Sequence, residues 1–171
     1  MVKRWHWISA ILVLLLSFPL HFLNEWTGFS PLTIYIAPIN ESIWEHLKLL
    51  AIPMILFSIP EYFLYGRPFP NFLPVRLLAI LSGMGAIIIS FYTYTGIMGT
   101  NFLIADILTL VFGIAVAYLF SYHFLHSPHF TSRKAVFQAQ AGFLVLILCL
   151  ILFTCYPPDL ALFKDWTQMK K

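Results

Sequence analysis

The segment FLIADILTLVFGIAVAYLFSYHFL, residues 102–125, decides the fold class of this chain. It contains one charged residue, Asp106, and it is longer than the roughly 20 mostly apolar residues that an α-helix needs to cross the hydrocarbon core of a bilayer. Four other segments have the same character. Together the five predict transmembrane helices over residues 5–23, 43–65, 75–98, 102–125 and 135–156. The sequence therefore predicts an all-α, polytopic membrane helical bundle of about five transmembrane helices, which forms a single domain over residues 1–171.

The composition of the whole chain also indicates a membrane environment. Of its 171 residues, 60% are hydrophobic and only 10% are charged, whereas a soluble domain has about 25% charged residues. A water-soluble fold with so few charges could not cover its surface, so we expect the lipid bilayer to cover it. The net charge is +3, and the Lys and Arg residues are scattered. Because nucleic-acid binding needs a basic patch or stripe, we expect no nucleic-acid partner.

The basic residues predict the orientation of the bundle, since they are enriched in cytoplasmic loops. With a cytoplasmic N-terminus, the cytoplasmic side holds Lys3, Arg4, Arg67, Arg76, Arg133 and Lys134. The opposite side holds Lys48, Lys164, Lys170 and Lys171. We therefore expect the N-terminus inside and the C-terminus outside.

The first loop, residues 24–42, is unusually apolar for a connection between two helices. Trp26, Phe29 and Leu32 make it unlike a solvated linker, and Pro31 and Pro38 prevent one long helix. Irregular backbone at membrane depth persists only against protein or a wet cavity. We therefore expect this loop to be an ordered cap or a re-entrant stretch at the outer interface, packed over the ends of the helices.

Small residues predict the faces on which the helices pack, because they let helix backbones approach closely in a membrane. One such face in the third segment consists of Ala79, Gly83, Ala86 and Ser90, and one in the fifth consists of Ala135, Ala139 and Gly142.

Ionisable and polar residues collect at the outer end of the predicted bundle. The second segment opens there with Asn40-Glu41-Ser42-Ile43-Trp44-Glu45-His46-Leu47-Lys48, and the first segment ends there with His21 and Glu25. Glu41 and Glu45 are four residues apart, so we expect them to share one helix face, with Lys48 one turn further along it. The residues from which we expect a ligand-binding pocket are Asn40, Glu41, Trp44, Glu45, His46, Tyr94 and Asp106.

Asp106 is the most informative member of this set. A carboxylate inside a span costs about 3 kcal/mol on insertion scales, so it should face the bundle interior and have a partner. The candidate partners are His46, Lys48 and Tyr94. We expect Asp106 to lie within hydrogen-bond or one-water reach of the Glu45–His46 turn, with Tyr94 completing the set.

Several roles remain open for these residues. Glu41, Glu45, His46 and Asp106 are candidate ligands of a divalent metal, the one cofactor that the residues suggest, because imidazole and carboxylate together suit zinc. Glu45, His46 and Asp106 are also candidates for general acid–base catalysis. In the simpler, structural interpretation, Asn40, Glu41 and Ser42 cap a helix, Trp44 anchors at the interface, and Glu45 pairs with Lys48 at the surface. For His123, His126 and His129, an interfacial position is favoured over a metal site.

The string Asn40-Glu41-Ser42-Ile43-Trp44-Glu45-His46-Leu47-Lys48 resembles the signature N-E-S-x-W-E-H-L-K of a family of small, uncharacterised bacterial membrane proteins. The resemblance extends to residues 94–96, 105–107, 153–158 and 163–165. It implies five helices and location in the cytoplasmic (inner) membrane of a prokaryote. It singles out Asn40, Glu41, Trp44, Glu45, His46 and Asp106, and it supplies no activity.

Two functional classes are consistent with these observations. The first is non-enzymatic: the protein binds or moves a small solute or ion, or serves as an accessory subunit of another membrane protein, because intramembrane ionisable residues most simply mark a ligand or ion path. The alternative is a membrane-embedded hydrolase or transferase, either metal-dependent or metal-independent.

Overall fold

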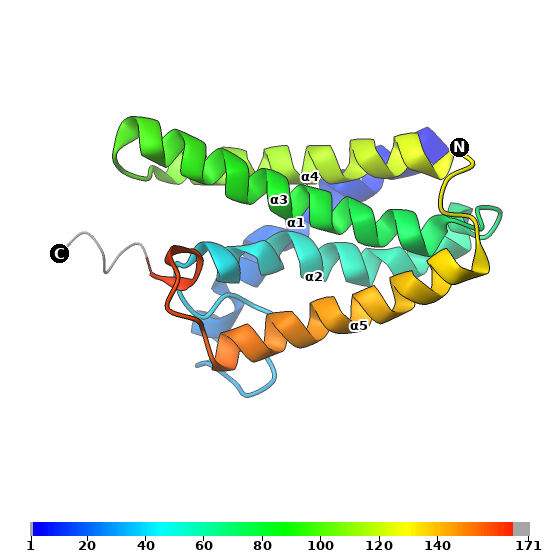
Figure 1. The fold of residues 1–171 in the computed structure, drawn as a ribbon. Coiled ribbons are helices and arrows are strands. Elements are labelled where there is room, and N and C mark those ends of the chain that lie inside the picture. Colours follow the sequence, from blue (N-terminus) through cyan, green and yellow to red (C-terminus); the bar gives the residue numbers. More distant parts are fainter. Residues whose placement is uncertain (1, 166–171) are drawn as a thin grey trace.

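Five long α-helices make up the fold of residues 2–165, the part of the chain that this computed structural model describes (Figure 1). They are α1 (Val2–Trp26), α2 (Ile43–Glu61), α3 (Phe72–Met98), α4 (Leu103–Leu125) and α5 (Arg133–Cys155). A π-helical turn, η1 (Tyr62–Gly66), continues α2, and a short 3-10 helix, η2 (Ala161–Phe163), follows α5. All five α-helices are long and apolar enough to cross a membrane, and residues 2–165 form no strand. The predicted all-α bundle of five such helices is confirmed.

The helices lie side by side, and the chain reverses direction at each connection (Figure 1). α3 packs against α2, α4 and α5, while α1 packs against α2 and α4. Because the number of helices is odd, the N-terminus lies at one end of the bundle and η2 at the other (Figure 1). The end that holds η2 also holds the start of α2 and the start of α4, and we call it the η2 end.

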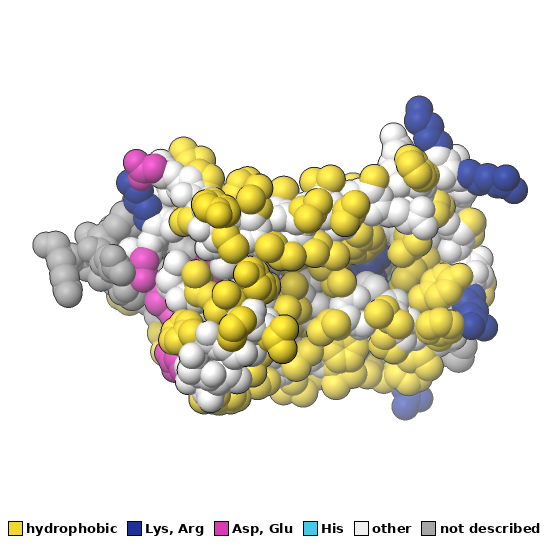
Figure 2. Space-filling model, turned by 90° about the horizontal axis from the view of Figure 1, so that it is seen from below, with side chains coloured by type: hydrophobic (Ala, Val, Ile, Leu, Met, Phe, Trp, Pro, Cys, Tyr) yellow, Lys and Arg dark blue, Asp and Glu magenta, His cyan; other side chains and the backbone are white. Residues whose placement is uncertain are grey.

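The outer surface has the distribution of side chains that a bilayer requires. Figure 2 shows a broad band of hydrophobic side chains over the middle of the face in view, with most of the charged side chains near the two ends. Large hydrophobic side chains such as Ile89 and Phe137 are about 70% exposed on the surface of the bundle. Lipid can cover such a band, whereas an aqueous solvent would disfavour it.

Local sequence determines where the helices begin and end. Ser42 and Ser132 precede α2 and α5, and each hydroxyl accepts a hydrogen bond from the backbone N–H three residues further on, at 3.3 and 3.1 Å. Such N-caps satisfy backbone donors that the first turn of a helix leaves free. At the other end of α3, Gly99 adopts a left-handed conformation (φ 71°), which glycine allows without a steric penalty.

The predicted small-residue faces lie where helices meet. Ala79 and Gly83 in α3 are buried, and Gly83 faces Gly113 and Ala117 of α4. In α5, Ala139 is buried and Gly142 lies against Leu77 of α3.

The first loop is held against the helices, as expected of a cap. The Asn24 amide in the last turns of α1 donates to the carbonyl groups of Ala37 and Pro38, at 3.1 and 2.9 Å. The Lys48 ammonium group donates to the carbonyl groups of Ile34 and Ala37. The apolar side chains of the loop nevertheless point outward, and Leu32 is 81% exposed.

One basic residue is not where the charge distribution predicted it. Arg76, expected among the flanking cytoplasmic residues, lies inside α3 with a side chain that is 1% exposed. Its ion-pair partner is Glu61, which lies inside the second predicted segment, residues 43–65. The tail residues Lys170 and Lys171, counted for the outer side, lie outside the described residues.

Candidate functional site

A cavity of about 280 Å³ opens between α1, α2, α3 and α4 at the η2 end of the bundle. Most of its wall is apolar, with Phe18 and Phe22 from α1 and Leu103, Ile107 and Leu110 from α4. The ionisable side chains that line it are those of His21, Glu41, His46 and Asp106. The cavity therefore combines an apolar wall with a small group of charged or titratable groups, which is the usual character of a small-molecule site.

Three of these side chains converge on one point. Nε2 of His46 lies 3.3 Å from Oε2 of Glu41, and the rings of His46 and His21 are 5.2 Å apart between centroids. One ligand atom from each of His21, Glu41 and His46 lies within 4.8 Å of the others. The Nδ1 atom of His21 is buried and has no hydrogen-bond partner among residues 2–165.

The backbone of the turn before α2 orients this group. Nδ1 of His46 lies 2.9 Å from the carbonyl oxygen of Ser42, an acceptor, so this nitrogen carries a proton and donates it. The hydrogen bond from His46 lowers the pKa of the Glu41 carboxyl, and partial burial opposes that effect. Glu41 is therefore an anion beside the two histidines.

Asp106 lies in the first turn of α4. Its carboxylate accepts hydrogen bonds from the Tyr94 hydroxyl group and, at 3.1 Å, from the Asn101 amide. The expected partner Tyr94 is thus in place, at the end of α3. No direct hydrogen bond joins Asp106 to Glu45 or His46 within the described chain; Asp106 and His46 instead line the same cavity and interact electrostatically.

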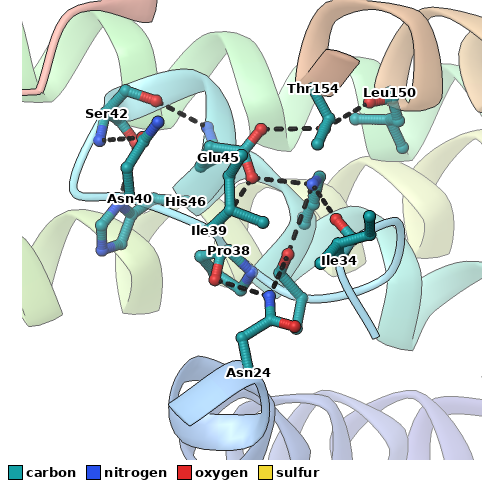
Figure 3. Close-up of polar contacts among 12 residues, drawn as sticks. Asn24, Ile34, Pro38, Ile39, Asn40, Ser42, Glu45, His46, Leu150 and Thr154 are labelled. Atoms are coloured by element: carbon teal, nitrogen blue, oxygen red, sulfur yellow. Dashed lines mark hydrogen bonds and ion pairs between the residues drawn. The ribbon is translucent and has the colours of Figure 1, made fainter. Parts of the chain in front are cut away.

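Glu45 lies away from the cavity, which the sequence did not predict. Its carboxylate accepts hydrogen bonds from Thr154 of α5 at 2.9 Å and from the backbone N–H of Ile39 at 3.0 Å (Figure 3). It also pairs with Lys48 at 2.7 Å, and both side chains are almost completely buried rather than at the surface. Glu45 therefore connects the first loop, α2 and α5.

The expectation that Glu41 and Glu45 share a helix face is wrong for a local reason. α2 begins at Ile43, and Ser42 is its extended N-cap residue. Glu41 thus precedes the helix, so helical spacing does not relate it to Glu45. Its side chain turns to His46 instead.

Asn40 and Trp44, also predicted as ligand-binding residues, do not line the cavity. The Asn40 side chain accepts a hydrogen bond from the backbone N–H of Ser42 at 2.9 Å, which stabilises the turn before α2. Trp44 packs against Phe153 of α5 and Phe163 of η2, with ring centroids 5.2 and 5.1 Å away.

A second buried polar cluster lies nearer the N-terminal end of the bundle, and it was not predicted from the sequence. Glu61 of α2 and Arg76 of α3 form an ion pair. The Arg76 guanidinium also donates to the Tyr65 hydroxyl group at 2.9 Å, and the Tyr118 hydroxyl group donates to Glu61 at 3.3 Å. The sequence does contain a signal for this cluster. Two opposite charges fall inside consecutive apolar segments joined by a short loop, and each charge needs a partner.

The three histidines near the end of α4 do not converge. His123, His126 and His129 are exposed, and in the described part of the chain the grouping of possible metal ligands is His21, Glu41 and His46.

The fold and the site define a class of protein: an all-helical bundle whose five helices can cross a membrane, with a partly polar cavity at one end. The chain belongs to a family of unknown function, DUF6512, whose model matches residues 1–170. The residues around Glu45 predicted membership in an uncharacterised family, and this prediction is therefore confirmed. Neither a curated protein nor a solved structure matches this chain.

Proposed function

We propose that this protein is an integral membrane protein that binds a small amphipathic cation in the cavity between α1 and α4. In this proposal the N-terminus is cytoplasmic, the cavity lies under the outer face, and the ligand arrives from that side or from the bilayer. The single observation that carries the proposal is the composition of the cavity wall, which is mostly apolar and whose ionisable side chains are those of His21, Glu41, His46 and Asp106.

The charges of the wall select the sign of the ligand. Asp106 accepts hydrogen bonds from a phenol and an amide, and no Lys or Arg pairs with it within residues 2–165. Glu41 adds a second carboxylate at the same end of the cavity. A carboxylate inside a membrane span needs a counter-charge, and an ammonium group on the ligand supplies one.

The remainder of the wall selects the body of the ligand. Phe18, Phe22, Ile107 and Leu110 offer aromatic and branched aliphatic contacts, which an apolar ring or short chain can fill. A small hydrophobic amine matches both ends of the cavity. Binding such a solute is compatible with a transporter or with an accessory subunit that presents the solute to another membrane protein.

The proposal is tested by measuring the binding of phenethylamine to the purified full-length chain. Calorimetry measures this binding in a neutral detergent with EDTA present. We expect saturable binding. We expect Asp106→Asn to weaken it more than about tenfold, because the substitution removes the carboxylate that pairs with the ammonium group but leaves the cavity volume nearly unchanged. Asp159→Asn is the matched control, since Asp159 is an exposed acid near the same end of the bundle.

Two further results decide the interpretation. Phenethyl alcohol, which has the same ring but no charge, should bind more weakly to the wild-type protein and equally to wild type and Asp106→Asn. The proposal is wrong if phenethylamine does not bind to the wild-type protein, or if it binds to Asp106→Asn as tightly as to the wild type.

One observation favours the enzymatic alternative, a membrane-embedded, metal-dependent hydrolase or transferase. His21, Glu41 and His46 place two imidazoles and a carboxylate around one point at the edge of the cavity. That arrangement can be examined independently of any substrate.

A further inference from the structure

We infer that His21, Glu41 and His46 form a binding site for one divalent metal ion, with zinc the best match. The site adjoins the cavity of the proposed ligand but does not need that ligand. It differs from the metal site predicted from the sequence, because it includes His21 of α1 and excludes Glu45 and Asp106. Glu45 is paired with Lys48 and Thr154, and Asp106 accepts hydrogen bonds from Tyr94 and Asn101.

The separation of the ligand atoms fits tetrahedral coordination. Zinc binds histidine nitrogen and carboxylate oxygen at about 2.0–2.2 Å, so two ligands of a tetrahedral ion lie about 3.3–3.5 Å apart. Nε2 of His46 and Oε2 of Glu41 are 3.3 Å apart. All three ligand atoms lie within 4.8 Å of one another, and rotation of the His21 ring can shorten the remaining distances.

The protonation of His46 supports a shared cation at this point. Its Nδ1 faces the Ser42 carbonyl oxygen at 2.9 Å and must be the donor. In a neutral imidazole the other nitrogen, Nε2, then has a lone pair, and it faces the carboxylate of Glu41, which can only accept. Two acceptors at 3.3 Å require a cation between them, either a proton or a metal ion. A backbone carbonyl that holds the far nitrogen is the usual support of a metal-binding histidine.

His21 distinguishes the metal ion from the proton. A proton on Nε2 of His46 satisfies Glu41 and His46 but leaves Nδ1 of His21 buried without a hydrogen-bond partner among residues 2–165. It also places a positive imidazolium next to a second imidazole. A metal ion instead uses a ring nitrogen of each histidine and one oxygen of Glu41. The metal therefore accounts for the convergence of all three side chains.

The ligand set leaves one coordination position open. Two histidines and one glutamate are three protein ligands, and a zinc ion with three protein ligands holds water or a substrate in the fourth position. Since all three side chains line the cavity, the fourth position can face its interior, which Asp106 also lines. A metal with this arrangement would polarise a bound ligand or lower the pKa of a bound water molecule. Zinc binding at this site would thus supply the cofactor of the enzymatic alternative.

Zinc titration of the full-length chain in detergent, purified without a polyhistidine tag and stripped with EDTA, tests the inference. We expect one zinc ion per chain by elemental analysis, and an intense visible absorption band with cobalt, as tetrahedral coordination gives. We expect zinc to raise the unfolding temperature, because a ligand that binds only the folded state stabilises it.

The variants Glu41→Gln, His21→Ala and His46→Ala should each weaken zinc binding more than about tenfold, since even supporting residues of a metal site contribute that much. They should also lose the rise in unfolding temperature. The control is His126→Ala, which removes an exposed histidine at the opposite end of the bundle and should leave zinc binding unchanged.

The outcomes are distinct. The inference is overturned if the wild-type chain binds no zinc, or if the Glu41→Gln, His21→Ala and His46→Ala variants bind zinc as tightly as the wild type and the His126→Ala control do. Glu41 is half exposed, and its ion-pair partner among residues 2–165 is His46, so Glu41→Gln remains informative if a histidine variant fails to fold. Phenethylamine binding is measured with EDTA present, so its failure and the failure of zinc binding are separate results.

Discussion

The backbone of Gly83 in α3 lies directly against the backbone of Gly113 in α4. A Cβ atom on Gly83 would lie 2.8 Å from the carbonyl oxygen of Gly113, and a Cβ atom on Gly113 would lie 2.9 Å from the carbonyl oxygen of Gly83. The two helices are therefore in contact at the level of their main chains. This contact also positions the cavity, because α3 contributes Ile87 and α4 contributes Asp106 to its wall.

Replacing Gly83 with Ala should destabilise the bundle. The added methyl group would meet main-chain atoms that cannot rotate away, and overpacking of this kind costs about 1–3 kcal/mol. Gly85→Ala is the matched control in the same helix, because nothing lies within 4 Å of its added Cβ atom. Alanine should there be neutral or stabilise by up to about 1 kcal/mol. Thermal unfolding of both variants in one detergent measures the difference, and equal unfolding temperatures would contradict the close packing.

Removing one partner of the Glu61–Arg76 ion pair should destabilise the protein much more than removing an exposed charge. Both side chains are almost completely buried, and breaking a buried pair costs about 3–5 kcal/mol because the remaining charge is left uncompensated. We expect this loss for Glu61→Gln and a smaller loss for Glu61→Gln combined with Arg76→Met.

The control for this prediction is Asp159→Asn, which breaks the exposed pair of Asp159 with Lys164 and should change stability by less than about 1 kcal/mol. Denaturant unfolding followed by tryptophan fluorescence gives the comparison. A double variant no more stable than Glu61→Gln alone would show that the two charges are not coupled.

Cysteine labelling in intact cells should establish the orientation of the bundle. Cys149 and Cys155 are free thiols, so both are first replaced with Ser. Leu32→Cys, in the exposed first loop, should then react with a membrane-impermeant maleimide. Arg67→Cys, exposed at the opposite end, should react only after the cells are permeabilised. The reverse pattern would place the cavity on the cytoplasmic side.

The helices could be predicted from the sequence because a membrane span needs only a long apolar run, which is a local property. The predicted segment 102–125 and the observed α4 (Leu103–Leu125) differ by one residue at the start. The positions of Asp106 and His46 near one cavity followed from a similar argument, since both residues lie at helix ends that reach the same side.

The partners of the charged residues could not be predicted in the same way. Which way Glu45 points depends on the rotation of α2 and on Thr154, 109 residues further along the chain. Whether Glu41 belongs to α2 depends on a single residue, because Ser42 ends the extended chain and caps the helix. By its position in the sequence, Arg76 resembled a basic residue that flanks a membrane span. Its burial is evident only in the structure, where Glu61 and Tyr118 contact it.

The Glu61–Arg76 pair has a consequence for how the chain would insert into a membrane during its synthesis. An unpaired charge at the centre of a membrane span costs about 2.5–3.5 kcal/mol. Glu61 is the last residue of α2 and Arg76 lies in the second turn of α3, so α2 and α3 would each bear part of that cost if they left the translocon separately. Together they carry a neutral pair, and only residues 67–71 connect η1 to α3. The two helices therefore form one unit of insertion, and a nascent chain halted after α2 would hold its newest span in the bilayer less firmly than a chain halted after α3.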